Sequence, residues 1–207
     1  KTARLTAMDL VNSIISLDHE AFLLINGFHS PFWDAVMWQI SDLFTWIPLY
    51  VFFLYLIQRR YGWRGLGIAV PVIALMIFLT DTGSVMLFKN TVQRLRPSHV
   101  DAFNNSIHLL TGSDGQLYRG GEFGFVSSHA SNHFGIAVFM AGLLSGMRKW
   151  ITPALLLWAG IICYSRIYLG VHFPADVVVG ALYGGIIGFG CAFSYKQLMF
   201  NFNKSGK

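Results

Sequence analysis

Long runs of apolar residues are the feature that most limits how this chain can fold. A helix that crosses a bilayer needs about 20 mostly apolar residues. We predict such spans within residues 31–57, 65–88, 129–146, 151–169 and 175–195. Of the 207 residues, 54% are hydrophobic and only 12% are charged, which is too apolar for an ordinary soluble domain. The sequence therefore predicts an all-α, polytopic transmembrane helix bundle with five spans.

The first 30 residues differ from these runs because polar side chains break their apolar pattern. The interrupting residues are Asp9, Asp18, His19 and Glu20. Placing such groups deep in hydrocarbon costs several kcal/mol, so the segment suits an amphipathic helix that lies in the membrane interface. We assign residues 1–30 to this interfacial segment and residues 31–207 to the transmembrane domain. A sixth crossing by the first segment is the alternative. Within 31–57, Asp34 and Asp42 make the opening third polar, so the embedded part begins near Leu43.

Basic residues away from the polar clusters predict the orientation of the chain. They lie between the first two predicted spans, between the third and fourth, and after the fifth: Arg59, Arg60, Arg64, Arg148, Lys149, Lys196, Lys204 and Lys207. With an odd number of crossings these groups share one side, which the positive-inside rule makes cytoplasmic. The loop of about 90–128 and the turn at 168–174 then face outward. A net charge of +5 could suggest nucleic acid as a partner, but the basic residues lie at the ends of apolar runs or in one loop. This placement favours phospholipid and phosphate, and we expect no role for nucleic acid.

The first polar cluster follows the second predicted span. Lys89 and Arg96 are seven residues apart, about two helical turns, so both can lie on one helix face before Pro97 stops the helix. Taken alone, this cluster is explained better by cations that snorkel at a membrane boundary.

The second cluster directly precedes the third predicted span. Ser127 is a natural N-cap, and the free N–H groups of a helix N-terminus attract an anion that His129 in the first turn could also reach. A capping serine beside an interfacial histidine explains this pair equally well in isolation. His129 and His133 have the i, i+4 spacing of metal ligands, but no Glu or Cys accompanies them, so we expect no metal.

The third cluster is the most specific of the three. Asp176 lies four residues after His172 and can accept its Nδ1–H, which leaves Nε2 as a lone-pair nucleophile. Arg166 can bind phosphate oxygens with both arms of its guanidinium. A structural His–Asp pair at a helix start is the alternative. It does not explain why three cations should meet at the same membrane face.

In their order and spacing, the clusters resemble the three-part signature of the phosphatidic acid phosphatase type 2 superfamily. The resemblance covers roughly residues 80–180. The first part of the family signature, Lys, six residues and Arg-Pro, is present in full, and so is the third, Ser-Arg, five residues, His, three residues and Asp. The matching residues are Lys89, Arg96, Pro97, Ser165, Arg166, His172 and Asp176. The second part, usually Pro-Ser-Gly-His, is matched at Ser127 and His129, with Val126 and Ser128 in place of Pro and Gly.

The resemblance implies an enzyme that removes phosphate from a membrane lipid without a metal or another cofactor. It implies His172 as nucleophile, His129 as general acid and Asp176 as the group that orients His172. It further implies a phosphate site made of Lys89, Arg96, Ser127, the Ser128 N–H and Arg166. Supporting roles are expected for Asp81, because intramembrane carboxylates are often functional, and for Arg94 and Arg119 as headgroup contacts.

The lipid substrates implied by the resemblance are undecaprenyl diphosphate, lipid A, phosphatidylglycerophosphate and phosphatidic acid. Two alternatives stay open: a phosphotransferase that passes the phosphoryl group from His172 to a hydroxyl, and a lipid-phosphate binding or transport protein without turnover. The expected location is the inner membrane of a bacterium, with the site facing the periplasm.

Overall fold

The structure is a computed structural model that describes residues 7–103, 106–112 and 114–205. In this part of the chain every regular element is a helix, and the only β-type pairings are two isolated bridges. The long helices are α1 (Ala7–Gly27), α2 (Pro31–Ser41), α3 (Ile47–Gly83), α5 (Ser128–Leu144), α6 (Ile151–Tyr168) and α7 (Pro174–Ser205). The short ones are η1 (Phe44–Trp46), η2 (Ser84–Lys89), α4 (Asn90–Val92), η3 (Pro97–His99) and η4 (Asp101–Phe103).

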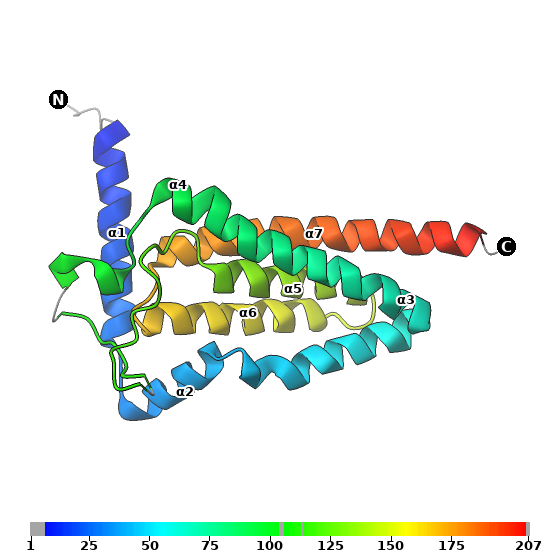
Figure 1. Ribbon diagram of the computed structural model, residues 1–207, viewed down its shortest axis with the longest axis horizontal. Coiled ribbons are helices and arrows are strands. Elements are labelled where there is room, and N and C mark those ends of the chain that lie inside the picture. Colours follow the sequence, from blue (N-terminus) through cyan, green and yellow to red (C-terminus); the bar gives the residue numbers. More distant parts are fainter. Residues whose placement is uncertain (1–6, 104–105, 113, 206–207) are drawn as a thin grey trace.

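The first two predicted spans are two helical arms that carry the single label α3 and meet at a kink at Gly62. At Gly62 the backbone of α3 has φ 69°, in the left-handed region that glycine tolerates, and the two arms of α3 run in opposite directions (Figure 1). The polar start of the predicted first span is a separate helix, α2, which ends at Ser41, just before the expected start of the embedded part.

Three helical stretches of the described chain are long and apolar enough to cross a bilayer: Phe44–Val92, Ile151–Tyr168 and Pro174–Phe202. The first holds both arms of α3, and α5, with 17 residues, packs against the second arm, α6 and α7. The protein is therefore an integral membrane protein with an all-α transmembrane bundle, as predicted. The count of five spans stays a prediction.

The bundle is tight where α5 meets α7. A Cβ atom added at Gly184 or Gly188 would overlap the carbonyl oxygens of Ser131 or Gly135 on α5. These two glycines have the spacing of a small-xxx-small motif, which lets helix backbones approach closely in lipid. The approach matters for the site, because the N-terminal ends of α5 and α7 carry two of the three sequence clusters.

The helix α1 lies across one end of the bundle, whereas α5, α6 and α7 run along its length (Figure 1). Its residues Asp18, Phe22 and Asn26 are buried against the bundle, whereas its apolar side chains are largely exposed. The assignment of this helix to the membrane interface stays a prediction. Residues 1–6 of the predicted interfacial segment lie outside the described residues.

The predicted cytoplasmic groups gather at the other end. The bend at Gly62, the α5–α6 loop and the C-terminal end of α7 lie together there (Figure 1). Arg60 Nη2 donates a hydrogen bond to the carbonyl oxygen of Ser145 at 3.0 Å, which links the bend to the end of α5. Lys207 lies outside the described residues.

The close α5–α7 contact predicts a position-specific effect of one methyl group. Gly184→Ala should lower the free energy of unfolding by roughly 1–3 kcal/mol, because the backbones must separate to admit the Cβ. Gly190→Ala on the same helix is the control, since nothing lies within 4 Å of its Cβ position. Thermal unfolding in detergent measures both, and equal stability of the two variants would contradict the contact.

Candidate active site

His172 is the centre of the site and is fully buried in the turn between α6 and α7. The guanidinium Nη1 of Arg96 lies 3.2 Å from His172 Nε2, and Asp176 Oδ2 lies 3.4 Å from His172 Nδ1. Because a guanidinium only donates, Nε2 must be the acceptor, and the ring proton is then on Nδ1. The geometry thus assigns the tautomer predicted from the sequence, with the lone pair on Nε2.

Asp176 is held from several directions in the first turn of α7. Its Oδ2 accepts the backbone N–H of Phe173 at 3.0 Å, and its Oδ1 accepts Arg94 Nη1 at 2.8 Å. Its carbonyl oxygen accepts the backbone N–H of Ser127 at 3.0 Å. The start of α7 is thereby tied to the start of α5, which brings the second and third clusters together.

The prediction that Arg96 lies two turns after Lys89 on the same helix is wrong, because α4 ends at Val92 and Gln93 adopts a left-handed backbone. Arg96 is placed instead by a short pairing in the loop that follows α4. Its N–H donates to the Glu122 carbonyl at 3.0 Å, beside the bridge between Leu95 and Phe123. Burial and the neighbouring Arg166 lower the pKa of Arg96 to about 10, so it stays a cation at neutral pH. The loop therefore delivers a fixed positive charge to His172 Nε2.

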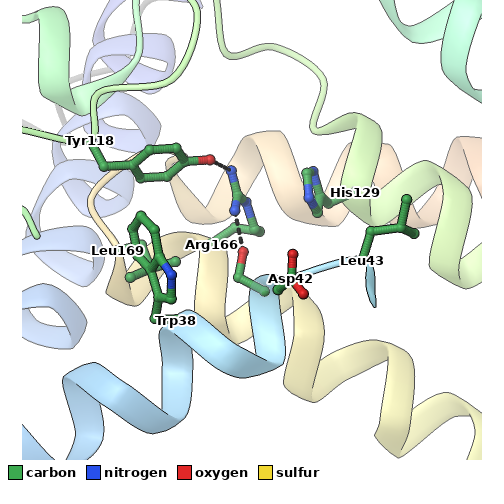
Figure 2. A pocket seen from close by; sticks show the side chains of 8 residues that line it. Trp38, Asp42, Leu43, Tyr118, His129, Arg166 and Leu169 are labelled. Carbon is green, nitrogen blue, oxygen red and sulfur yellow. Dashed lines mark hydrogen bonds between the residues drawn. The ribbon is translucent and has the colours of Figure 1, made fainter. Parts of the chain in front are cut away.

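Arg166, at the end of α6, lines a cavity of about 280 Å³ together with His129 (Figure 2). Its Nη2 donates to the Tyr118 hydroxyl at 2.9 Å, and its Nη1 donates to the Ser41 hydroxyl. Among the described residues its buried Nε–H has no hydrogen-bond partner. Since unpaired buried donors are costly, this N–H is available to an anion in the cavity.

Lys89 reaches the site from the π-helix η2, an element that is often found at functional sites. Its Nζ donates to Ser128 Oγ at 2.8 Å, and Ser84 Oγ lies 2.6 Å from the same oxygen. The serine that replaces the family's glycine thus takes up a direct contact with the first cluster. Ser127, as predicted, caps α5: its Oγ accepts the N–H of Ala130 at 3.4 Å.

His129 stands where two cavities meet. One is the cavity of Arg166, and the other is an apolar cavity of about 580 Å³ between the arms of α3 and α5. Leu43 and His129 line both, and the apolar one also contains Asp81, whose Oδ1 accepts Asn132 Nδ2 at 3.4 Å. The imidazole of His129 is therefore open to a ligand that extends from the charged cavity into the apolar one.

The two arginines expected at the headgroup are placed differently. Arg94 turns toward the carboxylates of Asp18 and Asp176, at 2.5 and 2.8 Å, rather than into the cavity. Arg119 donates to the Ser98 carbonyl at 2.6 Å and lines a separate hollow of the outer loop. The structure thus brings Lys89, Arg96, Arg166 and both histidines together, and leaves Arg119 outside.

Sequence reasoning missed four residues of this site: Asp18, Ser41, Asp42 and Tyr118. Asp18 holds Arg94, Ser41 and Tyr118 hold Arg166, and Asp42 lines the cavity opposite His129 (Figure 2). Ser41 and Asp42 are polar residues next to an apolar run, and this was the one sign in the sequence that they could belong to a site. Tyr118 lies in the outer loop without any motif around it.

The amino acids that bind metals do not gather at the site. Across the ranges that the structure describes, no group of three or more His, Cys, Asp and Glu side chains is arranged to hold a metal ion. The positive charges near His172 include those of Lys89, Arg96 and Arg166.

Comparison with known proteins identifies the family of this helical bundle. The model of the PAP2 superfamily matches residues 65–200, and the chain belongs to this superfamily, as predicted. It is 35% identical to lipid A 4'-phosphatase of Bacteroides thetaiotaomicron over 180 residues, which cover 86% of this chain and 77% of that protein. It is 31% identical to undecaprenyl-diphosphatase of Sulfolobus acidocaldarius, with coverages of 84% and 77%. The crystal structure of Aquifex aeolicus LpxE superposes with a TM-score of 0.59 at 28% identity, covering 84% and 94%.

The electrostatics of His172 predict a histidine that resists protonation. Burial, with the neighbouring cations Arg96, Arg166 and Lys89, holds the pKa of His172 well below its usual 6.5. A histidine with an ordinary pKa would be mostly charged at about pH 6. We expect His172 to stay neutral there, whereas the same residue in the unfolded chain is mostly protonated. The stability that the neutral ring contributes therefore begins to be lost as the pH falls below about 6.5, and the loss is complete once the pH has fallen through the lowered pKa.

The protonation state of His172 can be measured from the ring nitrogen chemical shifts of isotope-labelled histidine in detergent micelles. The His172→Asn variant assigns the signal. The predicted spectrum at about pH 6 retains the Nδ1–H, Nε2 lone-pair tautomer. Half-protonation of His172 near pH 6.5 would contradict the expected environment.

Proposed function

We propose that the protein hydrolyses a phosphate monoester on a membrane lipid through a phosphohistidine at His172. The observation that carries this proposal is the buried imidazole of His172, with Asp176 at Nδ1 and the Arg96 guanidinium at Nε2. Arg96 lies where the oxygens of a phosphate would bind when its phosphorus approaches Nε2. The relatives named as lipid phosphatases support the same chemistry.

The first half of the reaction transfers the phosphoryl group to His172. Its Nε2 lone pair attacks phosphorus, and the bond between phosphorus and the lipid oxygen breaks. The negative charge of the bound phosphate favours a proton on the neighbouring His129, and His129 donates this proton to that leaving oxygen. The imidazole of His172 keeps its Nδ1 proton, which the Asp176 carboxylate stabilises as positive charge develops on the ring.

The second half returns the enzyme to its starting state. His129, now neutral, removes a proton from water, and the oxygen attacks phosphorus. The bond between phosphorus and Nε2 breaks, and inorganic phosphate leaves. Arg96, Arg166 and Lys89 stabilise the charge on the phosphoryl oxygens in both halves, which is electrostatic work by groups that are already in place.

The two cavities suit a substrate with a charged head and an apolar tail. The cavity beside Arg166 would hold the phosphate, and the apolar cavity would hold part of a lipid chain. His129 stands between them, where the leaving oxygen would lie. This placement favours a lipid phosphatase over a phosphatase for small soluble esters.

We further propose that the site faces the outside of the cell membrane, which for a bacterial protein means the periplasm. The basic residues at the opposite end of the bundle support this orientation through the positive-inside rule. The division into an interfacial segment, 1–30, and a catalytic domain, 31–207, belongs to the same proposal.

Two substitutions separate the roles of the histidines. His172→Ala should lower phosphate release at least about a thousandfold with every substrate, because no nucleophile remains. His129→Ala should lower release from a lipid phosphate by roughly a hundredfold to ten-thousandfold. With an aryl phosphate, whose leaving group needs no proton, His129→Ala should release the phenol in a rapid first turnover, whereas His172→Ala should release none. Release of inorganic phosphate by His129→Ala should stay slow, because His129 is also the base of the second half.

Phosphate release from purified lipids in EDTA measures both variants against the unaltered protein. Undiminished release by His172→Ala would refute the nucleophile. Loss of release in EDTA would refute the metal-free mechanism, and a phosphorylated acceptor in place of free phosphate would reveal a phosphotransferase. A protein that binds lipid phosphate without releasing any would be a binding protein.

Asp42 favours a monoester over a diphosphate as the substrate. Its carboxylate lines the phosphate cavity with His129 and Arg166, and none of the ion pairs found among the described residues includes it. A fixed negative charge repels the second phosphate of a diphosphate but can accept hydrogen bonds from hydroxyl groups of a sugar or glycerol headgroup.

The charge at Asp42 therefore predicts a shift in substrate preference. Asp42→Asn should raise kcat/KM for a prenyl diphosphate relative to a lipid monophosphate by about tenfold, because the repulsion is removed and the shape is kept. Parallel assays of both lipids with both proteins give the ratio. An unchanged ratio would show that Asp42 does not discriminate between the two substrate classes.

A further inference from the structure

On α1, the carboxylate of Asp18 contacts the proposed catalytic machinery and is only 8% exposed. Its Oδ2 accepts Arg94 Nη2 at 2.5 Å, and its Oδ1 accepts the backbone N–H of Ala175 at 2.7 Å. Ala175 directly precedes Asp176. One carboxylate of α1 therefore binds both the arginine that contacts Asp176 and the backbone that carries it.

Arg94 joins the two carboxylates. Its Nη1 donates to Asp176 Oδ1 at 2.8 Å while its Nη2 donates to Asp18, and its Cζ lies 4.2 Å from the ring centroid of Phe173. The guanidinium is thus fixed by two ion pairs and an aromatic face, with 23% of its side chain exposed. Without Asp18, one of the two donor arms would have no carboxylate to hold it.

The other oxygen of Asp176 faces His172. Oδ2 accepts the Phe173 N–H at 3.0 Å and lies 3.4 Å from His172 Nδ1. The ion pair with Arg94 and the contact with His172 therefore use different oxygens of one carboxylate. Rotation of that carboxylate would disturb both together, so Arg94 sets the direction in which Oδ2 points.

A second contact from α1 meets the same turn. The ring of His19 stacks on Phe173 with centroids 4.7 Å apart and an interplanar angle of 22°. Asp18 and His19, neighbours in sequence, thus touch Ala175, Phe173 and Arg94 at once. Further along the same face of α1, Asn26 donates to the carbonyl oxygens of His108 and Tyr168 at 2.9 and 2.8 Å.

We propose that Asp18 is a positioning residue for the hydrolysis: through Arg94 and the N–H of Ala175, it fixes the carboxylate of Asp176 that orients the His172 imidazole. This inference rests on the proposed function of His172. It gives the N-terminal helix a role in catalysis, because the same element that carries an exposed apolar face also holds the orienting carboxylate in place.

The test compares Asp18→Asn with Glu20→Gln, which removes the same charge from an exposed position two residues further along α1. Asparagine can still accept the Ala175 N–H but cannot form the ion pair with Arg94. We expect kcat to fall about tenfold to a hundredfold in Asp18→Asn, with KM little changed, since displacement of a reacting group by about 1 Å can cost that much. Glu20→Gln should keep the original kcat.

A double-mutant cycle separates positioning from loss of folding. If Asp18 acts through Arg94, the double variant Asp18→Asn, Arg94→Gln should be about as slow as Arg94→Gln alone. Additive losses in the cycle, or an unchanged kcat in Asp18→Asn, would overturn the proposal. Asp18→Glu, which keeps the charge, should recover part of the activity.

The Nδ1–H proton resonance of His172 gives a readout that does not depend on turnover. It should shift in Asp18→Asn and Arg94→Gln and stay in place in Glu20→Gln, with thermal unfolding measured alongside. An unmoved resonance in Asp18→Asn would contradict the positioning role even if the variant were less stable. If the unaltered protein releases no phosphate from any lipid, the proposed function fails, while the shift still decides whether Asp18 orients His172.

Discussion

The buried imidazole of His172 lies between a carboxylate on one ring nitrogen and a guanidinium on the other, and the proposed chemistry depends on this arrangement. Asp176 keeps the proton on Nδ1, and Arg96 requires a lone pair on Nε2. Burial and the surrounding cations disfavour the charged ring. Together these interactions keep the His172 ring neutral, and therefore nucleophilic, beside cations that can bind phosphate. An exposed histidine in water would have neither the fixed tautomer nor the adjacent cations.

The bundle gives these groups a fixed place at one of its ends. Close backbone contact at Gly184 and Gly188 holds α7 against α5, so the starts of these helices, with Asp176 and Ser127, stay hydrogen-bonded to each other. The second arm of α3 continues through η2 to bring Lys89 to Ser128. Helix packing deep in the membrane thereby determines distances between charged atoms at its surface, and the apolar cavity beside His129 connects that surface with the interior.

Much of this could be predicted from the sequence because two signals are strong. Apolar runs of spanning length fix the helical class, and the signature spacings point to Lys89, Arg96, His129, Arg166, His172 and Asp176, which the structure gathers at one end of the bundle. Contacts between segments without a motif could not be predicted. The sequence predicts only that Asp18 is a polar group that keeps α1 out of the hydrocarbon. The ion pair that Asp18 forms with Arg94 is visible only in the structure. Arg94 was expected at a headgroup, and Ser41 and Tyr118 gave no local sign that they hold Arg166. Such pairings depend on how α1, α2 and the outer loop dock, which periodicity does not encode.

The most direct measurement is to quench the reaction with a radiolabelled lipid phosphate within its first turnover and to map the labelled residue under alkaline conditions, where phosphohistidine survives. The expected result is a phosphoryl group on Nε2 of His172, formed and lost at rates that match turnover. Label on His129 instead, or phosphate release with no labelled histidine at any time, would contradict a mechanism in which His172 is the nucleophile.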